Sequence, residues 1–118
     1  MFEIIFYRRA NGEVPVLDHL RRLNQENTKD SRIRKSKALQ YIKVLEQMGT
    51  RAGAPIIKHL DGDIWELRPS SDRILFAGVV GAKFVLLHVF EKKTQKTPRQ
   101  EIEQAKRELA EFLEDQED

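Results

Sequence analysis

The chain has 118 residues, of which 40% are hydrophobic, and it contains no Cys. This length favours one compact domain over residues 1–118, because a chain of this size buries roughly two-thirds of its unfolded surface without disulfide or metal staples. The lack of Cys excludes thiol catalysis, thiolate zinc sites and disulfides. No apolar run is long enough for a membrane span and no leader opens the chain, so we expect a cytoplasmic protein.

The net charge of +2 conceals an uneven distribution along the chain. Six of the 19 acidic side chains lie after Arg107, where no basic one occurs, so residues 1–107 carry 21 basic against 13 acidic side chains, a net charge of +8. A body this basic indicates an anionic partner. Nucleic acid is favoured over a membrane because no polybasic amphipathic helix with an aromatic face is evident. The alternative is a solvated surface that binds nothing.

A strand and two helices are predicted first. The apolar and aromatic run at residues 2–7 predicts a strand. Pro15, followed by apolar residues at helical spacing, predicts a short helix to about Asn24. Residues 30–48, which lack Gly and Pro, predict the longest helix, ended by Gly49. Its other face is basic and is either solvated or a surface that follows phosphates. The basic residues of that face are Arg32, Arg34, Lys35, Lys37 and Lys43.

Four strands follow, joined by hairpins. They are residues 56–60, 64–68, 73–80 and 83–90. Asp61-Gly62 and Gly81-Ala82 are typical of two-residue hairpin turns. The two helices before them are expected to pack as a pair on one side of the sheet.

The last element is a helix. Thr97, Pro98 and Gln100 predict its N-cap, its first helical position and a capping box. The pattern as a whole predicts an α+β fold with a mostly antiparallel sheet of about five strands, two N-terminal helices packed on one face, and a C-terminal helix.

The hairpins predict which side chains are neighbours on the sheet. The predicted opposite pairs are Val80 and Lys83, Leu75 and His88, Arg73 and Phe90, Glu66 and Leu75, and Arg68 and Arg73. One face is apolar or small and is expected to take the helices. It collects Trp65, Leu67, Ile74, Phe76, Gly78, Val85, Leu87 and Val89. The other face mixes apolar and charged side chains: Ile64, Glu66, Arg68, Arg73, Leu75, Ala77, Leu86, His88 and Phe90.

Arg68 and Arg73 form the predicted cross-strand pair on this second face. Like charges placed opposite each other destabilise a strand pair, so the pair indicates a site for an anion. The alternative is that Glu66 or Asp72 neutralises the two Arg on a solvated surface.

The loop after Phe90 emerges at the same end of the sheet and is basic. It contributes Lys92, Lys93 and Lys96, which are either solvated or part of the anion site, and it leads into a helix N-terminus, which also favours anions.

His88 is the candidate for proton transfer, because it falls on the charged face near Glu66. The alternative is a structural role at a strand end. No two of the three His have the spacing of metal ligands, so we expect no metal and no cofactor.

Three segments carry the most specific pattern. They are residues 65–68 (WELR), 72–75 (DRIL) and 87–98 (LHVFEKKTQKTP), the last leading to Glu101 and Ala105. With the order of the elements, they resemble the RelE-like toxins of bacterial toxin–antitoxin systems, in the phage-derived, HigB-type branch. The resemblance implies a RelE-like fold and a small basic ribonuclease that cleaves mRNA, usually on the ribosome. It also implies a neighbouring helix-turn-helix antitoxin of the HigA type as partner.

The resemblance also implies roles for single residues. Arg68 and Arg73 match Arg of the family motifs and are expected to bind the scissile phosphate and its transition state. The expected catalytic set is Arg68, Arg73, Lys93, His88 and Glu66, with His88 or Glu66 transferring the proton. The expected RNA-binding set is Lys92, Lys96, Lys58, Arg34 and Lys37.

Such cleavage uses the RNA's own 2′-hydroxyl. It needs cations for the charge that gathers on the phosphate, and it requires no metal. Two other functions stay open: a non-catalytic RNA- or DNA-binding module that uses the same basic face, and an inactive toxin kept as an interaction partner.

Overall fold

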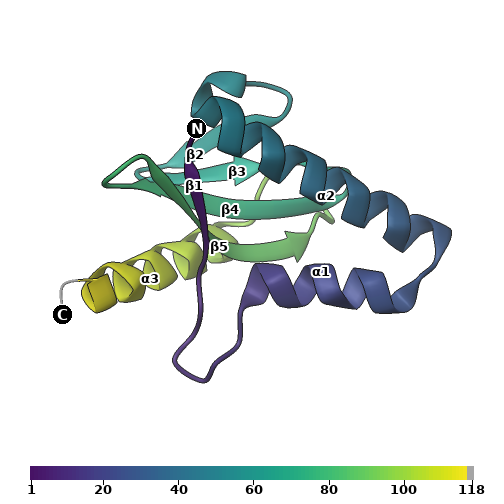
Figure 1. Ribbon diagram of the computed structural model, residues 1–118, viewed down its shortest axis with the longest axis horizontal. Helices are drawn as coiled ribbons and strands as arrows, with labels where there is room; N and C mark the ends of the chain where they lie inside the picture. The colour runs from purple at the N-terminus through teal and green to yellow at the C-terminus, as the bar shows by residue number, and fades with distance from the viewer. Residues whose placement is uncertain (117–118) are drawn as a thin grey trace.

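The computed structural model describes residues 1–116, which form five strands and three α-helices (Figure 1). In chain order the elements are β1 (Glu3–Phe6), α1 (Pro15–Glu26), α2 (Lys29–Met48), a short 3-10 turn η1 (Gly49–Ala52), β2 (Ile57–Asp61), β3 (Ile64–Leu67), β4 (Asp72–Val79), β5 (Lys83–Glu91) and α3 (Arg99–Gln116). The strands form one sheet in the order β1-β5-β4-β3-β2. Only β1 runs parallel to its neighbour β5, so the predicted α+β class and mostly antiparallel sheet are confirmed.

Local sequence explains the ends of the two first helices. Pro15 stands at the start of α1, as predicted, and the helix continues to Glu26, two residues past the predicted end. Thr28 caps α2: its side-chain oxygen accepts a hydrogen bond from the Ser31 N–H, and the Ser31 hydroxyl oxygen accepts one from the Thr28 N–H. Gly49, at φ 64°, ends α2, and a Cβ there would lie 2.8 Å from the Phe2 ring, so any other residue would strain the backbone and displace that ring.

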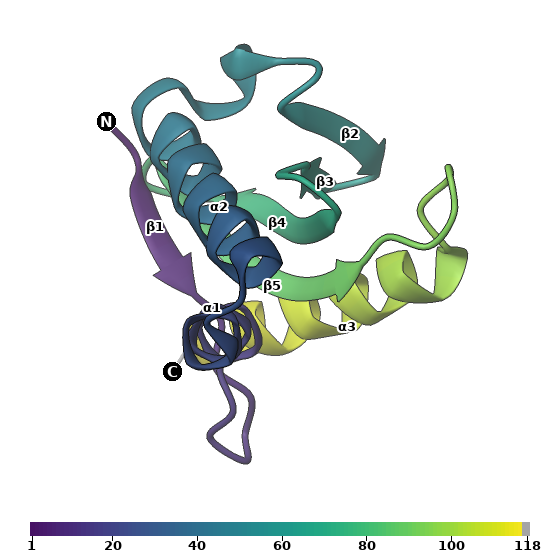
Figure 2. The same cartoon turned by 90° about the vertical axis from the view of Figure 1, so that its right-hand side faces the viewer.

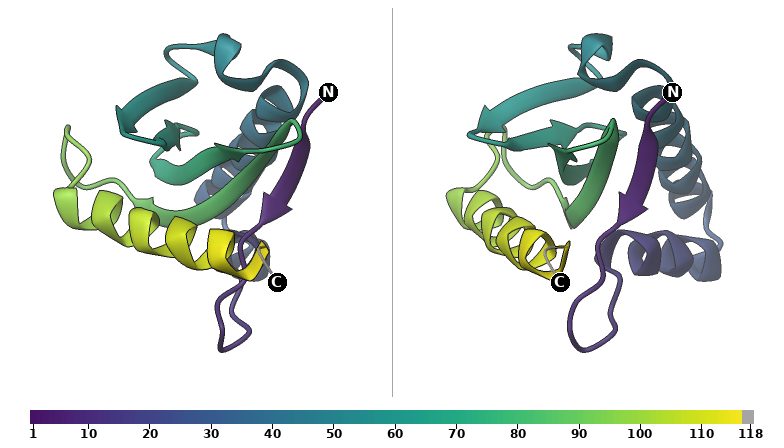
Figure 3. Two further views of the ribbon diagram at one scale, coloured as in Figure 1. Left: turned by 90° about the vertical axis from the view of Figure 1, so that its left-hand side faces the viewer. Right: turned by 60° about the vertical axis from the view of Figure 1, so that its left-hand side comes forward.

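Helices cover both faces of the sheet (Figures 2 and 3). On one face, α1 and α2 pack over a core that includes Leu20, Leu45, Ile74 and Phe76. On the other, α3 packs along β5 and β4 over a second core that includes Leu75, Val85, Leu87 and Phe112. None of the helices among residues 1–116 has the length and apolarity needed to cross a membrane.

The register of β4 and β5 differs from the predicted one near their turn. Val79 lies opposite Lys83, so the turn has three residues, with Gly81 at φ 92° and Ala82 at φ 58°, and the predicted pairing of Val80 with Lys83 is wrong. A bulge at Leu87 then takes up the extra residue, because Leu75 lies opposite His88 while the next residue, Phe76, lies opposite Leu86.

The shift exchanges the faces of three side chains. A register slip of one residue turns a side chain to the other face, so Val85 and Leu87 face α3 and Leu86 faces α1 and α2, opposite to the prediction. Beyond the bulge the predicted register is regained, and the pairs Leu75 with His88, Arg73 with Phe90 and Glu66 with Leu75 are confirmed.

Candidate functional site

A row of side chains crosses the sheet on the face that α3 covers in part. Lys58 on β2 lies opposite Glu66 on β3, Glu66 lies opposite Leu75 on β4, and Leu75 lies opposite His88 on β5. The β3–β4 ladder ends at Leu67 opposite Ile74, and Arg68 and Arg73 are the next residues on the two strands. Two cations therefore border the row at the turn end of this hairpin, on either side of the β3–β4 connection.

Glu66 is the anion beside these cations. Only 2% of its surface is exposed. Its Oε1 accepts a hydrogen bond of 2.5 Å from the Thr97 hydroxyl, and its Oε2 lies 3.5 Å from Nε of Arg68. The carboxylate therefore joins three segments: β3, the Arg68 side chain after it, and the end of the loop that precedes α3.

Arg73 is held rigidly and is only 7% exposed. Its Nη1 donates to the main-chain oxygens of Ser70 (3.0 Å) and Asp72 (2.8 Å). Burial lowers the pKa of the Arg73 guanidinium; the Glu66 carboxylate opposes this and the positive charge of Arg68 adds to it. Arg73 therefore presents a fixed positive charge that neutral carbonyl groups, rather than an ion-pair partner, hold in place.

Asp72, the residue before Arg73, forms an ion pair with Arg34 on the other side of the sheet. Arg34 of α2 binds the fully buried Asp72 carboxylate with both ends of its guanidinium, at 3.1 and 2.7 Å, and His19 Nε2 lies 3.3 Å from the same carboxylate. Burial acts to raise the pKa of Asp72, but bonds from His19 and Arg34 outweigh it and hold that pKa below its usual range. Arg34 thus fastens α2 to β4 and does not join the cluster around Glu66.

The lysine loop, residues 92–98, is tied to the site at both ends. The Lys92 N–H donates to the Ser71 oxygen (2.8 Å) in the β3–β4 connection, and Thr97 reaches Glu66 on β3. Between them Lys93 and Lys96 are exposed and Lys92 is half-buried. The two ends of the loop are therefore held beside the β3–β4 connection and beside Glu66. Lys37, by contrast, is exposed on α2, the helix across the sheet.

His88 makes its side-chain contacts with α3. Its Nε2 lies 2.8 Å from Oε1 of Glu101 and its Nδ1 3.5 Å from Oε1 of Glu108, both on α3. Burial raises the pKa of Glu108, although His88 and Arg9 act to lower it. The imidazole is thus held between two carboxylates of α3, and Leu75 separates its strand position from that of Glu66.

Thr97 is the residue of this cluster that sequence reasoning misses. The sequence predicts it only as the N-cap of the last helix, but its hydroxyl donates to a carboxylate 31 residues away. A Thr before Pro at a helix start is typical of a cap, and nothing in the local pattern points to Glu66.

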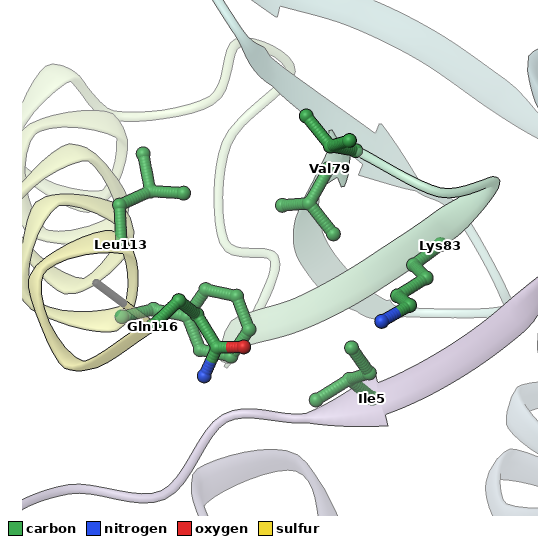
Figure 4. A pocket seen from close by; sticks show the side chains of 7 residues that line it. Ile5, Val79, Lys83, Leu113 and Gln116 are labelled. Carbon is green, nitrogen blue, oxygen red and sulfur yellow. The ribbon is translucent and has the colours of Figure 1, made fainter. Parts of the chain in front are cut away.

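An apolar pocket of about 330 Å³ lies at the other end of α3 (Figure 4). Ile5 of β1, Val79 and Lys83 of the β4–β5 hairpin and Leu113 of α3 line it. Because the lysine loop meets α3 at its N-terminal end, this pocket is separate from the basic cluster.

One family model matches the chain. It describes phage-derived Gp49-like proteins (DUF891), and it covers residues 18–110, from α1 through most of α3, including the whole cluster around Glu66. No curated protein matches the sequence.

Proposed function

We propose that this chain, which belongs to the Gp49-like family of phage-derived proteins, is a HigB-type toxin that cleaves mRNA on the ribosome. The family is tied to RelE- and HigB-like toxins, and the fold is consistent with the RelE-like one. The observation that carries the proposal is the position of Arg68 and Arg73 near one buried carboxylate, Glu66, with the two ends of the lysine loop fastened nearby.

The proposed chemistry needs only the RNA itself and these cations. The 2′-oxygen attacks the adjacent phosphorus, the bond from phosphorus to the 5′-oxygen breaks, and the products carry a 2′,3′-cyclic phosphate and a 5′-hydroxyl. Water takes up the proton of the 2′-hydroxyl and returns one to the departing 5′-oxygen. Arg68, Arg73 and Lys93 stabilise the negative charge that gathers on the phosphate oxygens, and Arg73 does so from a fixed position.

We assign the two candidate proton-transfer groups supporting roles in this scheme. Glu66 is engaged by Thr97 and Arg68, so it keeps the two Arg together and offsets their repulsion. His88 is engaged by α3. Charge stabilisation by the cations then supplies most of the rate enhancement. Lys58, directly opposite Glu66, and Lys92 and Lys96 of the loop bind the neighbouring phosphates.

The proposed partner is an antitoxin of the helix-turn-helix, HigA type, since a toxin-like family fits a neutralising partner. The test of the function is to induce the gene in bacteria and map the 5′ ends of transcripts. New ends within reading frames are expected for the natural chain and for Arg107→Ala, whose Arg is exposed on α3, but not for Arg68→Gln. Intact transcripts together with salt-dependent RNA binding by the purified protein would support the non-catalytic module instead.

A further inference from the structure

A groove lies between α1 and α2, on the side of the molecule away from the cluster around Glu66. It consists of two adjoining hollows of about 320 Å³ each, which share Asn24, Lys35 and Leu39. The two helices meet at the turn between Glu26 and Lys29 and spread apart from there (Figure 1). The groove opens where they meet.

Both helices contribute a continuous stripe to the groove. Residues at positions i, i+3, i+4 and i+7 of a helix share one face. On α1 these are Leu17, Leu20, Arg21 and Asn24, and on α2 they are Arg32, Lys35, Ser36 and Leu39. Leu20 is buried, whereas Leu39 remains 47% exposed and Leu17 is half-buried. The floor of the groove is therefore apolar and in part uncovered.

The rim of the groove is positively charged. Arg21, Arg32 and Lys35 line it, and no acidic side chain occurs among its lining residues. Neutral groups hold two of these cations: Lys35 Nζ donates to Asn24 Oδ1 (2.8 Å) and Arg32 Nη1 to the Asn27 oxygen (3.1 Å). Arg21 lies 3.8 Å from Asp18, with its side chain 67% exposed. Hydrogen bonds therefore hold Arg32 and Lys35 in place, and of the three cations Arg21 alone is described beside an acidic side chain.

We propose that this groove binds an acidic amphipathic helix of a partner protein. Its apolar face would cover Leu17 and Leu39, and its carboxylates would pair with Arg21, Arg32 and Lys35. An apolar helix face in a hydrophobic groove, with complementary charges at the rim, is an established mode of helix recognition. An RNA strand fits less well, because the floor is aliphatic and the lining holds no aromatic ring on which a base could stack.

The proposal goes beyond the nuclease function and does not depend on it. The helices α1 and α2 cover one sheet face, and Glu66 with the Arg pair belongs to the other. A partner helix in the groove therefore leaves the cluster around Glu66 uncovered.

The probe for the test is a fluorescent synthetic helix of about 18 residues, roughly five turns, with Leu on one face and Glu on the other. Its control is a peptide of the same composition in scrambled order. Binding of both to the full chain is measured by fluorescence anisotropy. The helical peptide is expected to bind, the scrambled one to bind much more weakly, and added NaCl to weaken binding.

Matched variants locate the site. Leu39→Ser and Lys35→Glu are each expected to weaken binding by about tenfold or more, as substitution of a central interface residue does. Ile33→Ser is the control, because Ile33 is equally exposed (48%) on α2 but does not line the groove. Thermal melting verifies that all three variants fold.

Several results would overturn the proposal. These are no binding of the helical peptide, equal binding of the scrambled one, and equal binding by Leu39→Ser and Ile33→Ser. Displacement of the peptide by a short single-stranded RNA would make the groove an RNA surface, and a dimer that Leu39→Ser abolishes would make a second copy the occupant. None of these readouts involves RNA cleavage, so they are independent of the nuclease test.

Discussion

The Thr97 hydroxyl donates a hydrogen bond of 2.5 Å to Oε1 of Glu66, and this bond joins the start of α3 to β3 across 31 residues of chain. The same carboxylate lies beside Arg68 and within electrostatic reach of Arg73. One hydrogen bond therefore couples the position of the lysine loop to the charge balance of the Arg pair.

Loss of this hydroxyl is expected to destabilise the protein and to release the loop. Thr97→Val keeps the shape of the side chain but leaves Oε1 of a buried carboxylate without its donor, which costs about 1–3 kcal/mol. Thermal unfolding measures the loss. Thr94→Val is the matched control, because that hydroxyl donates to the Lys96 oxygen in an exposed part of the same loop. Equal melting temperatures for the two variants would contradict the role of the Thr97 bond.

The Arg34–Asp72 pair is expected to contribute strongly to stability. Removing one partner leaves a buried charge uncompensated, so Arg34→Met should lower the free energy of unfolding by about 3–5 kcal/mol in urea titrations at pH 7. Asp30→Asn is the control: Asp30 also lies near Arg34, at 3.6 Å, but its side chain is 80% exposed. A similar small effect of both variants would mean that the pair does not fasten α2 to β4.

Asp72 also predicts a loss of stability in acid. Its pKa in the folded protein is lower than in the unfolded chain, where it is about 3.9, so its contribution is complete above that pH. The contribution is lost as the pH falls through the folded-state value. Unfolding free energies measured between pH 7 and pH 2 should therefore fall more steeply for the natural chain than for Asp72→Asn. If the unfolding free energies of the two proteins fell in parallel with pH, the lowered pKa of Asp72 would be contradicted.

The raised pKa of Glu108 predicts the opposite pH dependence, a loss of stability as the pH rises. Burial raises its pKa above the value of about 4.3 in the unfolded chain, so its contribution is complete below that pH and is lost as the pH rises through the folded-state value. Glu108→Gln should therefore gain stability relative to the natural chain between pH 4 and pH 7. Glu114→Gln, an exposed position on the same helix, is the control. A difference in unfolding free energy between Glu108→Gln and the natural chain that does not change with pH would contradict the prediction.

RNA binding distinguishes the lysine loop from the basic face of α2. The logarithm of the RNA-binding constant falls linearly with the logarithm of the salt concentration. Removing one Lys that neutralises a phosphate of single-stranded RNA makes this slope shallower by about 0.7. Lys93→Ala is expected to show this reduction. Lys37→Ala, on the helix across the sheet, is expected to leave the slope unchanged. Equal slopes for the two variants would mean that the lysine loop does not contact the RNA.

The sequence predicted those parts of the fold and site that rest on local pairing. Hairpin geometry placed Glu66 opposite Leu75, because short connections leave few alternative registers. The three-residue turn at 80–82 escaped prediction because Ala82 adopts a positive φ that its residue type does not signal. Contacts between distant segments could not be predicted either: Arg34 reaches Asp72 across 38 residues, and only the packing of α2 on the sheet brings them together.

Cleavage of mRNA on purified ribosomes tests the central claim most directly. The natural chain should produce fragments with a 5′-hydroxyl and a 2′,3′-cyclic phosphate, and Arg73→Gln, verified as folded, should slow their formation by about 10²–10³, as loss of one charge-stabilising donor does. Intact mRNA with the natural chain, or equal rates for the two proteins, would contradict the account.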